Sequence, residues 1–232
     1  MTERDTSPRA LILVGAGGFG REVLKYVVDA IADTPHLRLK GFLDDNPAAL
    51  KAFNTDLSVI GSIQGYAIQP EDRFVMTIGD PFLRAEITKG MQARGAIFQT
   101  IVHPTAYVAS SATLGSGCIV GPFSSIGSDA KVGDHVVLTW YSSLAHDSIS
   151  HTFVVLSPYS TANGSAVLEE GAFLGTHAVV NPMIRVGAWS KVASGSVVYR
   201  HVPPHSLAMG NPAKARPMLR PTAGEDPKAH TP

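Results

Sequence analysis

His146 and Asp147 are the residues whose types and spacing best suit chemistry. They lie side by side in the segment Leu144-Ala145-His146-Asp147-Ser148. An imidazole is well matched to moving protons near pH 7, and an adjacent carboxylate can fix its tautomer and raise its basicity. We therefore expect His146 to act as a general base and Asp147 as its partner.

A glycine-rich segment at 15–20 is the second candidate site. The sequence Gly15-Ala16-Gly17-Gly18-Phe19-Gly20 follows an apolar run and precedes a helical pattern. Such a loop lets the backbone approach a phosphate, whose negative charge the helix N-terminus favours. The alternative is a tight strand-to-helix turn. Asp44 and Asp45, which end the next strand, could bond a ribose or a base edge, or form a solvated acidic turn.

Strands and helices alternate through the first 100 residues. These elements must position the glycine-rich segment. The pattern predicts strands at 10–14, 37–43, 74–78 and 98–102, and helices at 23–31 and 81–94, the second opened by Asp80 and closed by Gly95. This is a small Rossmann-like α/β domain. Because fewer than 100 residues are present, one nucleotide fits better than a dinucleotide.

A repeat of aliphatic residues with a period of six begins where charged side chains become rare. Residues 1–94 carry 23 charged side chains, whereas 95–199 carry eight. Fourteen of sixteen positions spaced by six are Val, Ile or Leu, the breaks being Ser150 and Ala162. The sixteen positions are Val108, Leu114, Val120, Ile126, Val132, Leu138, Leu144, Ser150, Leu156, Ala162, Leu168, Leu174, Val180, Val186, Val192 and Val198.

A six-residue unit suits one short strand and a bend, with one side chain pointing into a narrow interior. Such hexads resemble the left-handed parallel β-helix of the hexapeptide-repeat acyltransferases, in which three hexads make one coil of eighteen residues. Gly164 follows His146 by one coil. Its backbone N–H should therefore face the same reacting group as His146 and bind an oxyanion.

The positions of the other histidines argue against a metal site. His103, His135, His177, His201, His205 and His230 have no carboxylate beside them in a break of the period, so we expect surface or structural roles. His146 and His151 form a His-x4-His pair, but a zinc site of the solenoid type would need a third histidine two coils earlier, where Ser110 lies and no histidine is near. We therefore expect no metal.

The charge balance gives no reason to expect a polyanionic partner. Nineteen basic residues balance nineteen acidic ones, so neither a nucleic acid nor a membrane surface is indicated. Cys118 is the single cysteine, and the first residues are polar, so a cytoplasmic protein is expected. No uncharged stretch is free enough of Gly, Ser and Pro to cross a bilayer.

Together these motifs resemble the bacterial sugar acetyltransferases of bacillosamine, perosamine and sialic acid biosynthesis, from about residue 10 to 216. The resemblance rests on the glycine loop, Phe42-Leu43-Asp44-Asp45, the hexads, His146-Asp147 and Gly210-Asn211-Pro212-Ala213-Lys214. It implies transfer of acetyl from acetyl-CoA to the amino group of a UDP- or GDP-linked sugar, in a homotrimer. It also implies His146, Asp147 and Gly164 as catalytic residues.

The resemblance also assigns the binding residues. Acetyl-CoA would contact Gly164, Gly175, Asn211, Pro212 and Lys214, and the sugar nucleotide would contact Gly15, Gly17, Gly18, Phe19, Asp44, Asp45, Trp140 and Tyr141. Phe19 replaces a frequent histidine, and Thr139-Trp140-Tyr141 replaces the usual Asn-Thr. Both aromatics must lie outside the prism, at a subunit interface, in the acceptor pocket or freely exposed.

The sequence leaves two alternatives open. An O-acetyltransferase on a sialic-acid-like sugar would use the same base, and a non-catalytic solenoid would only bind sugar nucleotide. The expected organisation is a flexible 1–9, a nucleotide-sugar domain at 10–101, the β-helix at 102–200, a CoA-side segment at 201–216 and a disordered tail at 217–232.

Overall fold

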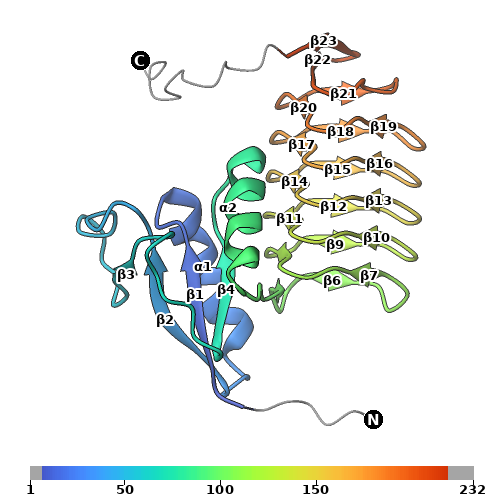
Figure 1. Cartoon of the computed structure of the whole chain (residues 1–232). Helices are drawn as coiled ribbons and strands as arrows, with labels where there is room; N and C mark the ends of the chain where they lie inside the picture. The colour runs from blue at the N-terminus through green and yellow to red at the C-terminus, as the bar shows by residue number, and fades with distance from the viewer. Residues whose placement is uncertain (1–6, 219–232) are drawn as a thin grey trace.

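The computed structural model describes residues 7–218. It consists of a small α/β domain beside a long β-solenoid, and confirms the expected α/β domain followed by a left-handed parallel β-helix (Figure 1). Residues 1–6 and 219–232 lie outside the described residues, so the expectations of a flexible start and a disordered tail stay predictions there.

The α/β domain contains a four-stranded parallel sheet in the order β3-β2-β1-β4. Its strands are β1 (Arg9–Val14), β2 (Leu37–Leu43), β3 (Val59–Gly61) and β4 (Asp72–Met76), and its helices are α1 (Gly18–Ile31) and α2 (Pro81–Ala93). Asp80 caps α2, because its side chain accepts hydrogen bonds from the Phe82 and Leu83 N–H groups. The short strand β3 has no counterpart among the strands expected from the sequence.

The solenoid has three sheets, called B, C and D below. Sheet B contains β5 (Ile101–Val102), β8 (Ile119–Val120), β11 (Val137–Leu138), β14 (Val155–Leu156), β17 (Phe173–Leu174), β20 (Lys191–Val192), β22 (Ser206–Gly210) and β23 (Ala213–Pro217). Sheet C contains β6 (Tyr107–Val108), β9 (Ser125–Ile126), β12 (Ser143–Leu144), β15 (Thr161–Ala162), β18 (Val179–Val180) and β21 (Val197–Val198). Sheet D contains β7 (Thr113–Leu114), β10 (Lys131–Val132), β13 (Ile149–Ser150), β16 (Val167–Leu168) and β19 (Arg185–Val186).

The first strand of the solenoid differs from its expected place. The sequence pattern assigns 98–102 to the α/β sheet, but β5 pairs with β8 in sheet B, and only Phe98 bridges back to Phe74 in β4. The chain therefore passes from one domain to the other within this segment. At the far end, β23 returns antiparallel to β22 and closes the solenoid with a hairpin.

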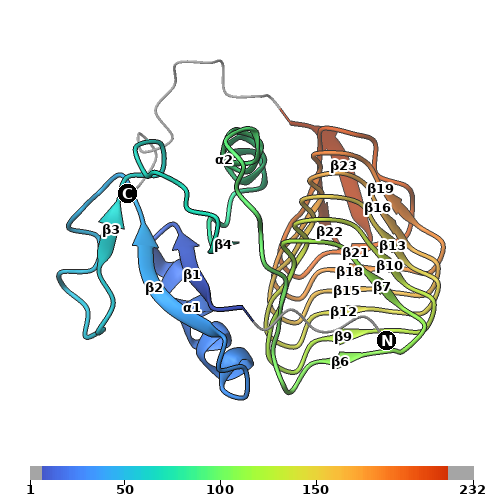
Figure 2. The same ribbon diagram turned by 60° about the horizontal axis from the view of Figure 1, so that its bottom comes forward.

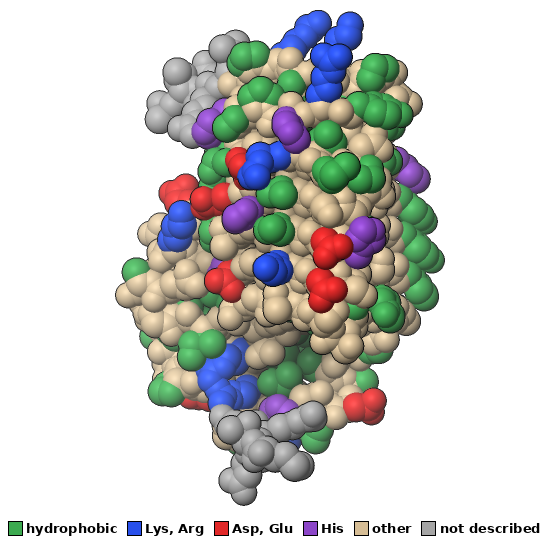
Figure 3. All heavy atoms as spheres, turned by 90° about the vertical axis from the view of Figure 1, so that its right-hand side faces the viewer, with side chains coloured by type: hydrophobic (Ala, Val, Ile, Leu, Met, Phe, Trp, Pro, Cys, Tyr) green, Lys and Arg blue, Asp and Glu red, His purple; other side chains and the backbone are tan. Residues whose placement is uncertain are grey.

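Charges are sparse on the solenoid surface. Figure 3 shows a face that is mostly uncharged, with basic side chains projecting at the end where β22 and β23 lie. From residue 171 to 218 the chain has no Asp or Glu, but it has five basic residues, namely Arg185, Lys191, Arg200, Lys214 and Arg216. This end of the solenoid is therefore electropositive.

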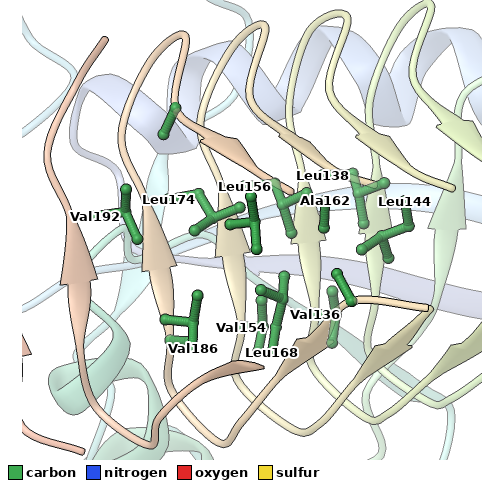
Figure 4. Close-up of a cluster of buried hydrophobic side chains, with 14 of the residues drawn as sticks. Val136, Leu138, Leu144, Val154, Leu156, Ala162, Leu168, Leu174, Val186 and Val192 are labelled. Atoms are coloured by element: carbon green, nitrogen blue, oxygen red, sulfur yellow. The ribbon is translucent and has the colours of Figure 1, made fainter. Parts of the chain in front are cut away.

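The hexad aliphatics fill the interior of the prism. Leu138, Leu156 and Leu174 follow one another at spacings of eighteen, are fully buried, and lie in register on neighbouring strands (Figure 4). The two breaks also point inward, since Ser150 and Ala162 are buried. The period is thus unbroken in geometry, and what changes is only the size and polarity of the inward side chain.

The corners of the prism have a regular backbone. Every sixth residue from Gly117 to Gly195 has a positive φ, including aromatic and acidic residues such as Tyr141 and Asp147. The corners form three edges, named by the sheets that they join. The BC edge includes 121–124, 139–142, 157–160, 175–178 and 193–196. The CD edge includes 127–130, 145–148, 163–166 and 181–184, and the DB edge includes 115–118, 133–136, 151–154, 169–172 and 187–190.

The α/β domain covers sheet B. Tyr26 and Val27 of α1 belong to the same buried cluster as Ile119 and Val137 of sheet B, and Figure 2 shows the domain on one side of the solenoid. Helix α2 contacts the DB edge, where the fully buried Arg84 donates a hydrogen bond from Nη2 to the His135 carbonyl at 2.8 Å. The two domains are therefore joined by a buried interface.

Candidate active site

His146 and Asp147 lie on the CD edge and contact each other. The His146 Nδ1 is 2.8 Å from Asp147 Oδ2, and the side chains are 68% and 60% exposed. Asp147 has the positive φ of the corners, 57°. With Nδ1 donating to the carboxylate, Nε2 is left as the nitrogen that can accept a proton.

Gly164 lies against the His146 ring. A Cβ at Gly164 would be 2.6 Å from both Cε1 and Nε2 of His146, so any side chain at this position would force the ring to move. Its N–H finds no acceptor among residues 7–218, while its carbonyl accepts from the Met183 N–H at 3.0 Å. Gly164 and the His146 ring are therefore neighbours on the CD edge, whereas binding of an oxyanion by the Gly164 N–H stays a prediction.

The glycine loop connects β1 to α1. Some of its glycines are required by the turn, and others are not. A Cβ at Gly20 would be 2.0 Å from the Gly15 carbonyl, and Gly15 itself has a φ of +104°. The turn therefore requires glycine at both positions. A Cβ at Gly17 would meet nothing within 4 Å, and one at Gly18 would meet only the end of Arg21. The fold does not require glycine at these two positions, whose outer face is open to a ligand.

Asp44 and Asp45 hold loops together. The Ala16 N–H of the glycine loop donates to Asp44 Oδ2 at 2.7 Å, and the Asn46 N–H donates to Asp44 Oδ1 at 2.8 Å. Asp45 Oδ1 accepts from the Ile63 N–H at 3.1 Å. The structure therefore brings Asp44 to the glycine loop as a brace, while a contact of either carboxylate with a ribose stays a prediction.

The glycine loop stands at the point where the strand order of the sheet reverses. β2 and β3 lie on one side of β1 and β4 lies on the other, and ligands of open α/β sheets bind at the carboxyl ends of the strands there. Thr77, which follows β4, donates from Oγ1 to the Val14 and Gly15 carbonyls at 2.8 and 2.7 Å. Gly79, after Thr77, has open space around its Cβ position. The sequence predictions did not include Gly79, whose only signal is its place between β4 and the capping Asp80.

Trp140 and Tyr141 lie outside the prism, as expected, but point to different neighbours. The Trp140 ring is partly buried and meets Tyr26 of α1 edge-on, with ring centroids 5.8 Å apart. Burial and a hydrogen bond to Glu22 raise the pKa of Tyr26. Tyr141 is exposed and stacks between Phe123 and Tyr159. Trp140 therefore joins the two domains of one chain, and a contact of either ring with substrate stays a prediction.

The residues expected to bind CoA are divided among three places. Gly175 lies on the BC edge, where a Cβ would be 2.7 Å from the Ser194 N atom, so close coil packing explains this glycine. Asn211 and Pro212 form the turn between β22 and β23, and Lys214 in β23 is exposed. Only Gly164 of this group lies at the level of His146.

The two candidate sites lie on different sides of the molecule. The glycine loop belongs to the domain that covers sheet B, whereas His146 is on the CD edge, the edge of the triangular prism opposite sheet B. Within residues 7–218, His, Cys, Asp and Glu side chains nowhere gather in a group of three that could hold a metal ion. None of the helices in the same range is long and apolar enough to cross a membrane.

Comparisons with known proteins agree with both domains. Residues 10–91 match the family model of the PglD N-terminal domain. The acetyltransferase domain of PglB from Neisseria gonorrhoeae, solved with acetyl coenzyme A, is 26% identical, with a TM-score of 0.80 over 90% of this chain and 100% of that one. PerB from Caulobacter crescentus, solved with CoA and GDP-perosamine, is 28% identical, with a TM-score of 0.76 over 89% and 97%.

Curated relatives match over a shorter stretch. A putative acetyltransferase of Staphylococcus aureus, SACOL2570, is 48% identical over 42 residues, which are 18% of this chain and 21% of the relative. Serine acetyltransferase 2 of Arabidopsis thaliana is 43% identical over 58 residues, which are 25% of this chain and 17% of the relative. The chain thus spans about a fifth of the length of the curated relatives that it matches. The expected resemblance is confirmed by the whole-chain structural matches.

Proposed function

We propose that this chain, whose two domains are those of the bacillosamine and perosamine type of sugar acetyltransferase, is an acetyl-CoA-dependent N-acetyltransferase acting on a UDP- or GDP-linked amino sugar. One observation carries the proposal. The His146 and Asp147 pair meets the free Gly164 N–H on an open edge, in a fold whose solved relatives hold acetyl-CoA or CoA, and in one case a nucleotide-linked amino sugar.

The site supplies what an acyl transfer needs. The sugar amine attacks the thioester carbonyl carbon, and His146 Nε2 accepts the proton that the amine loses. The tetrahedral oxyanion receives a hydrogen bond from the Gly164 N–H. The C–S bond then breaks, and the CoA thiolate takes the proton from His146. Throughout, Asp147 holds the Nδ1 proton and thereby keeps Nε2 directed at the reacting atoms.

The glycine loop is proposed to hold the diphosphate of the sugar nucleotide. The open faces of Gly17 and Gly18 lie at the N-terminus of α1, whose free N–H groups favour negative charge. Gly79 and the start of α2 follow β4 at the same end of the sheet as the glycine loop. The nucleobase that fits there determines whether UDP or GDP is used.

A working site is proposed to combine two copies of the chain. His146 lies opposite the sheet that its own α/β domain covers, so a sugar held by one chain faces away from the histidine of that chain. The outward residues of sheet C, beside the CD edge, are uncharged and suit packing against another copy: Tyr107, Ser125, Ser143, Thr161, Val179 and Val197. A homotrimer with closed symmetry would bring each glycine loop to a neighbour's His146.

A thiol-release assay tests the reaction. CoA release from acetyl-CoA is measured across UDP- and GDP-linked amino sugars, with the matching hydroxy sugars as controls. We expect release with one amino sugar nucleotide and a loss of about 10²- to 10⁴-fold for His146→Asn. Release with the hydroxy sugars alone would support O-acetylation instead, and binding without release would support a non-catalytic solenoid.

A mixing experiment tests the two-copy site. His146→Ala and Gly17→Val variants are co-expressed in equal amounts and assayed at a sugar-nucleotide concentration far below the raised KM of Gly17→Val, where each variant alone shows almost no activity. If loop and histidine come from different copies, about a quarter of the sites pair an intact loop with an intact histidine, and about that share of the activity returns. If both come from one chain, no activity returns, and the proposed arrangement is wrong.

A further inference from the structure

Two adjacent residues break the hexad repeat on the coil that carries His146. Ser150 occupies an inward position that most hexads give to Val, Ile or Leu. Ser150 is buried and donates a long hydrogen bond of 3.4 Å from Oγ to the His151 carbonyl, while His151 is exposed. The proposed reaction leaves both residues unused. His151 occupies a place in the hexad that is glycine at positions 115, 121, 127, 133, 175 and 187.

A pocket of about 310 Å³ lies at this break, on sheet D. Val132 and Ser150 are its buried residues, whereas Lys131 and His151 are exposed. Figure 3 views the side of the solenoid on which sheet D lies in Figure 1, and it shows basic, acidic and histidine side chains on this mostly uncharged face. The repeat therefore changes at a hollow in the surface. The pocket is lined by Lys131, Val132, Gly133, Ile149, Ser150, His151, Thr152 and Glu170.

Lys131 and His151 are available to a ligand. Neither the Lys131 Nζ nor the His151 ring makes a hydrogen bond within residues 7–218. The carboxylate of the pocket already has a cationic neighbour, since Glu170 Oε1 is 3.9 Å from Lys89 Nζ. The ammonium and imidazole N–H groups therefore offer hydrogen bonds to the oxygens of an anion.

The second acidic residue beside the pocket is also engaged. Glu169 follows His151 by eighteen residues and so lies one coil further along. Its Oε1 accepts from Arg185 Nη1 at 2.8 Å, and its Oε2 accepts from the Ala188 N–H at 2.9 Å. The carboxylates near the pocket are thus directed to partners on the next elements, and the N–H groups on Lys131 and His151 remain for a ligand.

The pocket lies beside His146 on the neighbouring face of the prism. Ile149 follows His146 by three residues on the same coil, which is at most about 10 Å of extended chain. Lys131 pairs with Ile149 from the preceding coil. Because sheet C, on the other side of the CD edge, is proposed to pack against another copy, we expect a substrate to reach His146 over sheet D.

The α/β domain of a neighbouring copy would lie at the height of the pocket. Within one chain, Tyr26 and Val27 of α1 pack with Ile119 and Val137 of sheet B. Lys131 lies between Ile119 and Val137 in the sequence, and therefore at the same height on the solenoid. Rotation about a symmetry axis parallel to the solenoid leaves heights unchanged, so the domain that holds the glycine loop in one copy can face the pocket of the next.

We propose that this pocket binds the anomeric phosphate of the sugar nucleotide, with Lys131 Nζ and the His151 ring donating hydrogen bonds to its oxygens. This rests on the proposed function and its two-copy site. The glycine loop of one copy holds the diphosphate from one side, and the pocket of the next copy holds it from the other. A hexose ring with its anomeric phosphate suits the separation of at most about 10 Å between His146 and Ile149, so the amine reaches His146 while the phosphate stays in the pocket.

Lys131→Met and His151→Gly are the variants that test the pocket. Glycine is the common residue at this place in the hexad, and His151 is not among the residues with positive φ, so neither change strains the fold. A hydrogen bond to a charged group contributes a factor of about 10 or more, so each variant should raise the KM for the sugar nucleotide about tenfold. The kcat and the KM for acetyl-CoA should stay within about twofold. Lys191→Met, which removes the same charge from sheet B, should change none of these values.

Calorimetry shows which part of the nucleotide the pocket binds. UDP is compared with UMP, or GDP with GMP, according to the sugar nucleotide that is active in the thiol-release assay. The diphosphate contains the phosphate that bears the sugar, and the monophosphate lacks it. We expect both variants to weaken diphosphate binding about tenfold and to leave monophosphate binding within about twofold. Unchanged diphosphate binding with unchanged KM in both variants overturns the proposal. An equal loss for the monophosphate also overturns it, because the pocket would then hold the nucleoside end.

Co-expression separates this proposal from the proposed function. In the mixture of His146→Ala and Gly17→Val chains, a working site takes its loop from the first chain and its solenoid from the second. Lys131→Met should therefore raise the KM of the recovered activity when it is added to the Gly17→Val chain, and leave it unchanged when it is added to the His146→Ala chain. The reverse result, or no effect in either chain, overturns the proposal. Absence of CoA release by the unaltered chain would instead refute the proposed function, and the pocket proposal with it.

Discussion

Replacing Gly164 with alanine moves the His146 ring and leaves the backbone N–H in place. A Cβ would be 2.6 Å from Cε1 and Nε2, whereas ordinary contact begins at 3.4 Å. The ring must therefore shift by about 0.8 Å, and a misplacement of about 1 Å in a reacting group can cost about 100-fold in rate. We expect Gly164→Ala to lower kcat by about 10- to 100-fold.

The fold should tolerate this change. Gly164 is not among the residues with positive φ, and the ring that must move belongs to a side chain that is 68% exposed. We therefore expect the free energy of unfolding to change by less than about 1 kcal/mol. The KM for acetyl-CoA should stay within about threefold, since the change disturbs the proton acceptor and not the nucleotide end of the donor.

The assay is steady-state CoA release, combined with thermal unfolding of the same samples. Gly90→Ala is the matched control, because Gly90 lies in α2 with nothing within 4 Å of its Cβ position. It should keep the full kcat and gain about 1 kcal/mol of stability from helix propensity. A kcat for Gly164→Ala within twofold of the unaltered chain would refute the idea that the position of His146 against Gly164 matters for transfer.

Three further predictions concern the α/β domain and its junction with the solenoid. Gly17→Val should fold normally and raise only the KM for the sugar nucleotide. Gly20→Ala should instead unfold at a lower temperature, because its Cβ would be 2.0 Å from the Gly15 carbonyl. Equal changes of KM and of unfolding temperature in the two variants would contradict this difference. Burial lowers the pKa of His135 to about 4, so up to about 3 kcal/mol of stability present above pH 6.5 is lost as the pH falls toward 4. Urea titrations should show that loss, and His135→Phe should reduce it. Arg84→Met should lower the free energy of unfolding by about 2 kcal/mol or more and raise the KM for the sugar nucleotide, because the carbonyls of Met76, Ile78 and His135 lose their donor. A change in the KM for acetyl-CoA alone would contradict this role.

The solenoid could be predicted closely from the sequence because its order is local and repeated. Each hexad places one aliphatic inside and one bend at the corner, so the register of Leu138 on Leu156 follows from counting. The same counting places Gly164 on His146. In this fold, residues that are eighteen apart in the sequence lie next to each other on neighbouring coils.

The junction of the two domains could not be predicted in this way. Trp140 is marked as unusual by the sequence, but its contact with Tyr26 depends on how α1 lies across sheet B, which no repeat encodes. The fully buried Arg84 likewise donates to carbonyls both of its own domain and of the solenoid, although its place in an ordinary helical pattern gives no sign of it.

A ladder of stacked rings on the BC edge is present in the sequence, yet the sequence predictions do not contain it. Phe123, Tyr141, Tyr159 and His177 share one phase of the period, and that phase is a corner where side chains of neighbouring coils stack. His177 is expected only to be a surface or structural residue, because the aliphatic inward phase and the histidine beside a carboxylate are the stronger signals. The outward phases of a repeat hold the functional differences, since the inward phase is constrained by volume.

The constant coil spacing fixes the distances between sites along the solenoid axis. Each coil advances the chain by about 4.8 Å, so the distance between the level of His146 and the β22–β23 hairpin can change only in whole coils. Removing one coil, for example 165–182, would keep every corner in phase while bringing the two levels about 4.8 Å closer. The length of the donor arm that such an enzyme accommodates is therefore set in discrete steps by the number of repeats between its two ends.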